Sequence, residues 1–125
     1  MLDPAVHAAL ARELHESERS RVQLEQFSKR YPQMTVQDSY AIQRAWMQLK
    51  RDEGQRMIGH KIGLTSRAMQ IASQITEPDY GTLLDSMLLR DGSEVDVARF
   101  IVPRFEVEFA FILAKPLEGP HVTLV

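Results

Sequence analysis

The chain has 125 residues, a length that predicts one domain and allows a sizeable buried core. Fifteen Lys and Arg residues stand against seventeen Asp and Glu residues, so the formal net charge is −2, which excludes the basic character typical of nucleic-acid binding. The absence of cysteine excludes disulfides and thiolate nucleophiles. No apolar run approaches the ~20 residues that cross a bilayer. We therefore expect a cytoplasmic protein with no membrane or nucleic-acid partner.

The first part of the chain predicts helices. Asp3 followed by Pro4 is a helix start signal, and apolar residues recur at every fourth position after it, so the first helix is expected to reach about Ser17. Ser20 and Gln23 resemble a capping box and predict a second, short helix that ends before the next proline.

A third helix is predicted from Thr35 and Asp38, which form another start signal. Apolar residues at helical spacing follow, namely Ala41, Ile42, Ala45, Trp46 and Leu49. Gly54 comes after Lys50 and Arg51, as expected where a helix ends. Residues 1–54 are therefore predicted to form a helical region.

The character of the sequence changes after Gly54. The short apolar run 57–65 contains two glycines and predicts a strand with close backbone approach. Ser66 can cap a short helix that reaches Ile71. Residues 77–81, with proline, aspartate and glycine, predict a turn or loop.

The last part of the chain predicts more strands. Asp91-Gly92 is a hairpin signal between the apolar runs 87–89 and 95–97. The run 104–113 is the most strand-like in the chain. Helices first and strands later indicate an α+β fold. We expect one domain over residues 1–125, with the β region from residue 55 onward.

Glu106 and Glu108 are candidate metal ligands. In a strand they project from one face with Cα atoms ~6.6–6.8 Å apart, so both carboxylates can reach one ion, and Mg²⁺ commonly uses one or two carboxylates. An isolated pair of this kind also fits a solvated edge strand. The apolar continuation from Phe109 favours a cation, because unpaired charge near a core is costly. Glu94 and Asp96 have the same spacing without that continuation, and we interpret them as solvated.

Two other residues are candidates for chemistry. Lys61 lies between glycines on an apolar strand, where its ammonium can bind a substrate carboxylate or act as an acid if its pKa falls; a solvated lysine at a sheet edge is the alternative. Asp79 is stiffened by the preceding proline, although turn chemistry alone also explains it. The histidines His7, His15 and His121 are predicted at the surface.

Three motifs in this order resemble one family. They are the runs 59–66 (GHKIGLTS), 75–81 (ITEPDYG) and 101–111 (IVPRFEVEFAF). Together they resemble the hydratase/decarboxylase family of aromatic meta-cleavage pathways, within the fumarylacetoacetate-hydrolase-like superfamily. The similarity runs along essentially the whole chain and covers only the N-terminal half of the family's length.

The resemblance implies a fold and a metal site. The fold would be a helical N-terminal region followed by a mixed, coiled β-structure, usually in homo-oligomers. Three acidic residues would hold Mg²⁺ or Mn²⁺: Glu106, Glu108 and a third that lies beyond Val125. The motif around Lys61 would supply the active-site lysine, and Asp79 would be the acid of the Pro-Asp-Tyr-Gly loop.

The implied activity is hydration. The substrate would be a 2-hydroxy-2,4-dienoate or its 2-oxo tautomer, with 2-oxo-hept-4-ene-1,7-dioate of homoprotocatechuate degradation as the first choice. Asp79 would be the general acid or base, and Lys61 would bind or polarise the oxo-acid end. Arg104 is the candidate for a distal carboxylate.

Two alternatives stay open. One is a metal-dependent decarboxylase of the same family, acting on a 2-oxo-3-enedioate. The other is a non-catalytic partner subunit that docks through an apolar strand edge. The chain also ends on Val122-Thr123-Leu124-Val125 without a polar tail or a helix stop signal, which predicts a piece of a longer protein.

Overall fold

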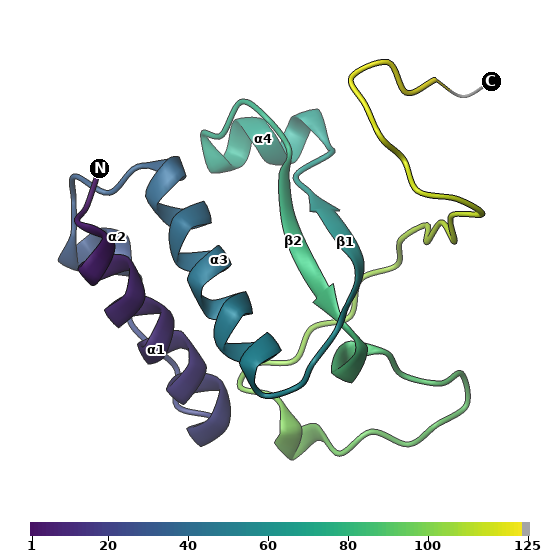
Figure 1. Cartoon of the computed structure of the whole chain (residues 1–125), viewed down its shortest axis with the longest axis horizontal. Coiled ribbons are helices and arrows are strands. Elements are labelled where there is room, and N and C mark those ends of the chain that lie inside the picture. The colour runs from purple at the N-terminus through teal and green to yellow at the C-terminus, as the bar shows by residue number, and fades with distance from the viewer. Residues whose placement is uncertain (124–125) are drawn as a thin grey trace.

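The computed structural model describes residues 1–123. A helical part and a β part lie side by side in it (Figure 1). The elements in chain order are α1 (Pro4–Ser20), α2 (Phe27–Arg30), α3 (Val36–Asp52), β1 (Met57–Gly63), α4 (Arg67–Ser73), β2 (Asp79–Leu84) and the 3-10 turns Asp85–Met87 and Val97–Arg99. The α+β class predicted from the sequence is confirmed. Within residues 1–123 the β part is one two-stranded antiparallel sheet, β1 with β2.

Helices α1 and α3 pack against each other and run in the same direction (Figure 1). Both begin as predicted, because the Asp3 carboxylate accepts a hydrogen bond from the Ala5 amide at 2.7 Å and Thr35 and Asp38 form a reciprocal capping box. Leu10, Ala11 and Ile42 form the buried core between the two helices. Trp46 and Leu49 pack on the edge of that core, as their helical spacing predicted.

The core makes Ile42 a sensitive position. Its side chain is buried against Leu10 and Ala11, so Ile42→Val should lower the free energy of unfolding by about 0.5–1.5 kcal/mol, the usual cost of one deleted buried methylene. Chemical denaturation followed by circular dichroism measures this change. Val22→Ala, at an exposed position, is the matched control and should stay within about 0.5 kcal/mol of wild type.

The second helix differs from the prediction. Helix α1 continues to Ser20, whose hydroxyl donates to the Glu16 carbonyl oxygen at 2.8 Å, so this side chain is used inside α1 and does not cap a new helix. Arg21 then ends α1 with a left-handed φ of 59°. The short helix α2 begins only at Phe27, and the prediction of a helix opening at Ser20 and Gln23 was wrong.

A buried polar cluster joins the start of α1 to the start of α3. One oxygen of the fully buried Asp38 accepts hydrogen bonds from the Leu2 amide at 2.8 Å and from His7 Nε2 at 2.7 Å. The other oxygen accepts from the amide and the hydroxyl of Thr35, at 2.9 and 2.8 Å. His7 is therefore buried, and its predicted surface position was wrong. The reason is that Asp38 gives its imidazole a hydrogen-bond partner inside the protein.

The same cluster fixes the charge state of Asp38. Burial alone would raise the pKa of this carboxyl, but the hydrogen bonds from Thr35, His7 and the Leu2 amide outweigh it and hold the pKa well below its usual range. Asp38 is therefore an anion that the fold stabilises with four donors.

The sheet has a defined register. Lys61 pairs with Gly81, Ile62 with Tyr80, and Gly63 with Asp79. Residues 79–81 are thus the first part of strand β2, and their prediction as a turn or loop was wrong, because β1 offers them a hydrogen-bonding partner that their local sequence does not reveal. The strand predicted at 57–65 and the helix predicted from Ser66 to Ile71 are confirmed as β1 and α4.

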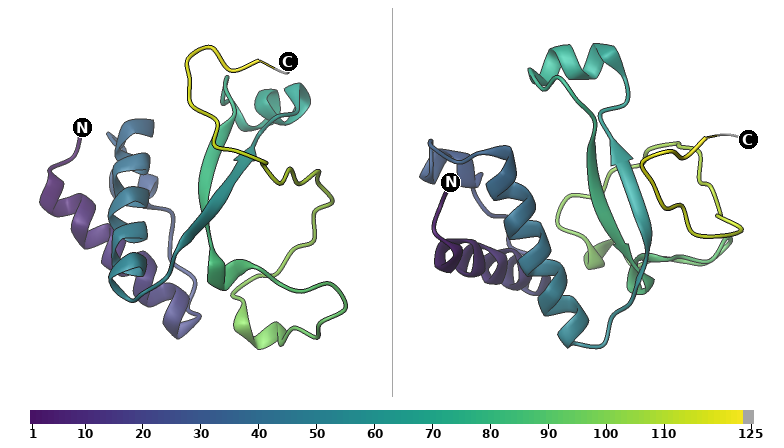
Figure 2. Two further views of the ribbon diagram at one scale, coloured as in Figure 1. Left: turned by 45° about the vertical axis from the view of Figure 1, so that its right-hand side comes forward. Right: turned by 45° about the horizontal axis from the view of Figure 1, so that its top comes forward.

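One face of the sheet packs on α3. The Tyr80 ring stacks on the Tyr40 ring with centroids 4.6 Å apart, and the Gln43 amide donates to the Tyr80 carbonyl oxygen at 3.2 Å. In Figures 1 and 2 the last part of the chain, coloured yellow, lies on the side of the two strands away from α1 and α3, whereas Met87 and Phe100, earlier in the segment after β2, share a pocket with Glu18 of α1. The face of the sheet opposite α3 is turned toward Glu106 and Glu108, which contact Lys61.

The segment after β2 departs most from the predictions. A turn forms at Asp91-Gly92, where Gly92 has a φ of 74°, but the runs 87–89 and 95–97 do not pair as strands. The run 104–113 is not a strand in the described part of the chain either. Both strand predictions were wrong for this structure, because β-propensity alone cannot supply the neighbour that a strand's backbone needs.

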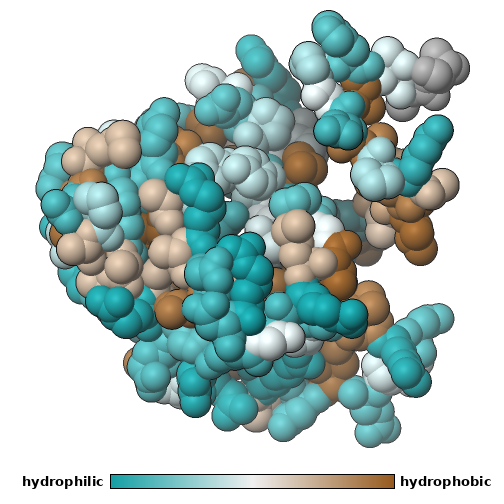
Figure 3. Space-filling view, viewed as in Figure 1, coloured by the Kyte–Doolittle hydropathy of each residue, from teal (hydrophilic) through white to brown (hydrophobic). Residues whose placement is uncertain are grey.

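This segment also exposes apolar side chains. Phe105, Val107 and Phe109 are each at least 93% exposed, and hydrophobic side chains reach the surface on this side of the molecule (Figure 3). Among residues 1–123 no helix combines the length and the apolar character needed to cross a membrane. Leu124 and Val125, part of the chain end from which a longer protein was predicted, lie outside the described residues.

Candidate functional site

Lys61 lies on β1 and is surrounded by glycines. Its neighbours on the same face of the strand are Gly59 and Gly63, and the residue opposite it on β2 is Gly81. A Cβ atom added at Gly59 or Gly81 would meet nothing within 4 Å. The four-carbon side chain of Lys61 therefore has open space around it, and it is 44% exposed.

The two candidate metal ligands converge on this lysine. The Lys61 ammonium lies 2.6 Å from Glu108 Oε1 and 3.4 Å from Glu106 Oε2. Both carboxylates thus contact the same ammonium group, although Lys61 precedes them by 45 residues or more in the sequence. The side chain between them, Val107, points to solvent. Side chains in 106–108 therefore alternate in direction as they do in a strand, although this run pairs with no other strand.

The ion pairs determine the charge of Lys61. The hydrogen bond to Glu108, and after it that to Glu106, raise the pKa of the lysine and outweigh its partial burial. In this arrangement Lys61 is held as a cation. A lysine held as a cation can bind a carboxylate, whereas action as an acid would require a lowered pKa.

Asp79 lies at the start of β2 on the same face as Lys61, because its partner Gly63 is two residues from Lys61. A Cβ atom added at Gly63 would lie 2.2 Å from Asp79 Oδ1. Glycine at position 63 therefore leaves the space that this carboxylate occupies. Within residues 1–123, no hydrogen bond or ion pair involves the Asp79 side chain.

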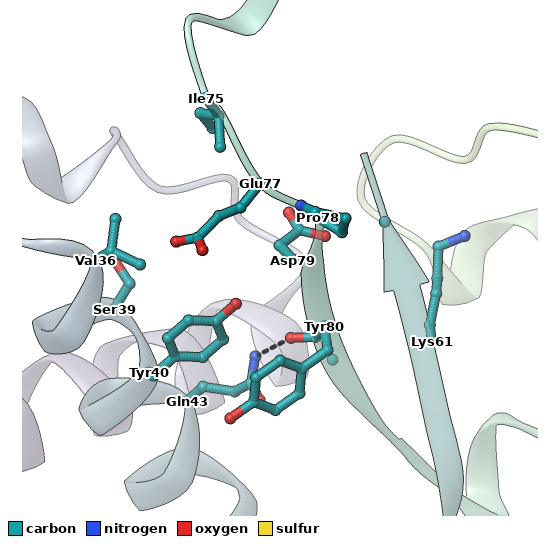
Figure 4. Close-up of a pocket in the computed structure, with 12 residues that line it drawn as sticks. Val36, Ser39, Tyr40, Gln43, Lys61, Ile75, Glu77, Pro78, Asp79 and Tyr80 are labelled. Carbon is teal, nitrogen blue, oxygen red and sulfur yellow. Dashed lines mark hydrogen bonds between the residues drawn. The ribbon is translucent and has the colours of Figure 1, made fainter. Parts of the chain in front are cut away.

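A pocket of about 450 Å³ opens between α3 and the beginning of β2. Figure 4 shows Glu77 pointing toward α3 above the Tyr40 ring, with the Tyr80 ring below and the Lys61 side chain on β1 pointing away from this group. The lining residues are Val36, Ser39, Tyr40, Gln43, Lys61, Gly63, Ile75, Glu77, Pro78, Asp79, Tyr80 and Gly81. Two of the predicted site residues, Lys61 and Asp79, thus line one cavity.

The donor set for a metal is incomplete in the described part of the chain. The Lys61 ammonium acts as a stand-in cation and shows that Glu106 and Glu108 can serve one positive ion together. Among residues 1–123, however, no group of three histidine or acidic side chains is placed to hold a metal. The two carboxylates fit the chemistry of a hard divalent cation, with further oxygen ligands required from elsewhere.

Arg104 is not brought to these residues by any described contact. Its side chain is exposed and, within residues 1–123, forms no ion pair or side-chain hydrogen bond. The structure therefore brings together Lys61, Glu106 and Glu108, places Asp79 on the same sheet face, and leaves Arg104 in solvent.

Comparison with known proteins identifies the relatives of this chain. It is 55% identical to the 2-oxo-hept-4-ene-1,7-dioate hydratase of Escherichia coli over 124 residues, which are 99% of this chain and 46% of the hydratase. It is 43% identical to the 2-hydroxyhexa-2,4-dienoate hydratase of Comamonas testosteroni over 88% of this chain and 42% of that protein. The chain is thus similar to hydratases of this kind over most of its own length.

Solved structures show a similar fold. The 4-oxalocrotonate decarboxylase from Pseudomonas putida G7, solved with calcium and acetate and again with magnesium and adipate, matches the fold with a TM-score of 0.67 and 29% identity. The match covers 69% of this chain and 33% of that chain. No family model matches the chain. The chain spans about half the length of the curated relatives it matches.

The sequence did not reveal every residue around this site. Tyr40 and Gln43 line the pocket but belong to no recognised motif, because their place there depends on α3 packing against β2. Glu77 also lines it; it belongs to the motif 75–81 but was not singled out as a site residue. The glycines around Lys61 were visible in the sequence, and the strand register now explains them as the space around one side chain.

Proposed function

We propose that this chain carries part of the active site of a divalent-metal-dependent hydratase. The reaction would add water to a 2-hydroxy-2,4-dienoate or its 2-oxo tautomer, with 2-oxo-hept-4-ene-1,7-dioate as the first substrate to test. The observation that carries the proposal is the convergence of Glu106 and Glu108 on one cation in a chain 55% identical to a hydratase named for that substrate. Assembly into homo-oligomers and a preference for Mg²⁺ or Mn²⁺ are part of the same proposal.

Each residue has a role in this reaction. A bound divalent cation would supply Lewis-acid polarisation of the substrate's C2 oxygen. Glu106 and Glu108 would hold that cation, and Lys61 would bind the C1 carboxylate through its ammonium. Asp79 would deliver a proton to C5 as the dienol becomes a 2-oxo-3-enoate. Water would then add its oxygen to C4 and a proton to C3, giving a 4-hydroxy-2-oxo acid.

The test is turnover of a 2-hydroxy-2,4-dienoate by the chain with Mg²⁺, followed by product analysis. Hydration is expected as a metal-dependent loss of the conjugated dienol and a gain in mass of one water. Loss of all turnover on chelation, and its return on adding Mg²⁺, would separate metal dependence from damage to the protein. Turnover that persists without any divalent cation would contradict the proposal.

A decarboxylase is the second candidate, because a 4-oxalocrotonate decarboxylase of Pseudomonas putida is 35% identical over 90% of this chain. Release of carbon dioxide from a 2-oxo-3-enedioate, without hydration, would favour it. The exposed apolar side chains at Phe105, Val107 and Phe109 fit the remaining candidate, a non-catalytic partner subunit. Co-purification with a second chain, and no loss of dienoate with the isolated protein, would favour that role.

Gly63→Ala tests the position of Asp79. The new methyl group would overlap Asp79 Oδ1, so the carboxylate must rotate away while the fold and the metal ligands stay in place. We expect kcat to fall about 10- to 100-fold, within the usual contribution of a positioned acid or base, with Mn²⁺ affinity unchanged. Gly59→Ala, on the same strand but on the side of Lys61 away from Asp79, is the matched control, because its added Cβ meets nothing within 4 Å. An equal loss of kcat in both variants would contradict the role of Asp79.

A further inference from the structure

The ion pairs of Lys61 have an unusual structural role. Among residues 1–123 no backbone hydrogen bond ties the run 104–113 to the strands, and Phe105, Val107 and Phe109 pack on nothing there. The polar contacts that hold this run against β1 are those of Glu106 and Glu108 with the Lys61 ammonium. One lysine therefore gathers the two carboxylates at the sheet.

A metal ion and this ammonium compete for the same oxygens. A divalent cation needs carboxylate oxygens at about 2.0–2.6 Å, and Lys61 already lies 2.6 Å from Glu108 Oε1. Two cations that share the same pair of carboxylates repel each other. Binding of a divalent cation there requires Lys61 to leave.

The displaced Lys61 side chain has open space along the sheet. The neighbouring glycines on its face, Gly59, Gly63 and Gly81, put no side chain in its path. Its flexible stem allows the ammonium to swing along the sheet toward the end where Asp79 lies. The strand register puts Lys61 and Asp79 on one face of the sheet, so the released ammonium stays beside the candidate acid.

We propose that Lys61 is the counter-cation of the metal-free site and that a divalent cation, on binding between Glu106 and Glu108, displaces its ammonium and frees it to bind the carboxylate of an oxo-acid. This inference rests on the proposed function, since it concerns the same site. It implies an order of binding in which the metal comes first and the anionic substrate second. It also implies that Lys61 weakens metal binding in the absence of substrate.

Metal affinity tests the competition. Mn²⁺ alone is titrated into the full chain and followed by electron paramagnetic resonance, for wild type, Lys61→Met and Lys115→Met. Removing the competitor should tighten Mn²⁺ binding by about 3- to 10-fold in Lys61→Met, the scale of one or two exposed ion pairs. Lys115→Met removes the same charge without a described contact to the carboxylates and should leave the affinity within about 1.5-fold.

A second measurement uses the wild-type chain and therefore does not require a variant to fold. A carbodiimide couples a contacting amine and carboxylate into an amide with loss of one water, and mass spectrometry locates the bond. The metal-free chain should give the Lys61–Glu108 or Lys61–Glu106 amide, and Mg²⁺ should suppress it. The surface pair Lys29–Glu25, at 3.6 Å, is the internal control, and its amide should be unaffected by Mg²⁺.

The outcomes separate the inference from the proposed function. If Mn²⁺ binds but Lys61→Met leaves its affinity unchanged or weaker, or if Mg²⁺ does not suppress the Lys61 amide, the displacement is wrong while the metal site stands. If neither wild type nor Lys61→Met binds Mn²⁺ at millimolar concentration, the metal site itself fails and the displacement fails with it.

Discussion

Glu106→Gln and Glu108→Gln are each expected to lower the affinity for Mn²⁺ at least about 100-fold, because changes to residues that only orient metal ligands already cost 10–100-fold. Each substitution keeps the size of the side chain and removes one of the two negative charges that converge at Lys61. Turnover of a 2-hydroxy-2,4-dienoate should fall at least about 100-fold as well, since Lewis-acid polarisation is worth several kcal/mol.

Glu94→Gln is the matched control for this prediction. Glu94 and Asp96 repeat the Glu-x-acid spacing on the same segment, and both are exposed. The Asp96 carboxylate accepts a hydrogen bond from the Ala98 amide at 2.9 Å, which accounts for it as a local cap. Glu94→Gln should leave Mn²⁺ affinity and turnover near wild type. Equal losses in Glu94→Gln and Glu108→Gln would show that general surface charge, and not a site, attracts the metal.

Asp38→Asn is expected to destabilise the helical part strongly. Each oxygen of Asp38 accepts hydrogen bonds from two donors, so in either orientation the new amide nitrogen would face two donors instead of accepting from them. Because such a buried network leaves unsatisfied groups when it is broken, we expect the Tm to fall by at least about 5 °C. Thermal unfolding followed by circular dichroism at neutral pH measures this.

The pH dependence gives an independent signature of the same cluster. The folded-state pKa of Asp38 is lowered, so its contribution to stability is fully present above the ordinary Asp pKa of about 3.9 and is lost as the pH falls toward the folded-state value. Asp38→Asn should therefore lose less stability than wild type when the pH is lowered below about 4. Asp91→Asn, at an exposed turn, should keep the wild-type slope. Parallel slopes for wild type and Asp38→Asn would contradict the assignment.

Local signals predicted the two long helices, the helix after Ser66 and the first strand. The start of α3 was readable because a capping box is made by residues three positions apart. Strand β1 was readable from its apolar run and its glycines. Two predictions failed because a side chain could bond to more than one partner. The Ser20 hydroxyl donates back to the Glu16 carbonyl oxygen instead of capping a new helix. His7 was predicted at the surface, but a carboxylate 31 residues away in the sequence bonds to it inside the protein.

The candidate site shows the same division. The residue types at Lys61, Asp79, Glu106 and Glu108 were recognisable from three motifs in order. The Lys61 contacts with Glu106 and Glu108, and the pocket that Tyr40 and Glu77 share with Asp79, were not. These relations join residues from different elements, and spacing along the chain carries no information about which distant segment will lie against a given strand face.

The sequence by itself determined the α+β class, the starts of the main helices and the family resemblance, because caps, periodicity and motifs are properties of neighbouring residues. Only the tertiary structure decided that residues 79–81 pair with β1, that the run 104–113 does not pair as a strand among the described residues, and that Lys61 is the cation between two glutamates. The physical reason is that a strand and an ion pair both need a partner, and the partner's position is fixed by the packing of the whole chain.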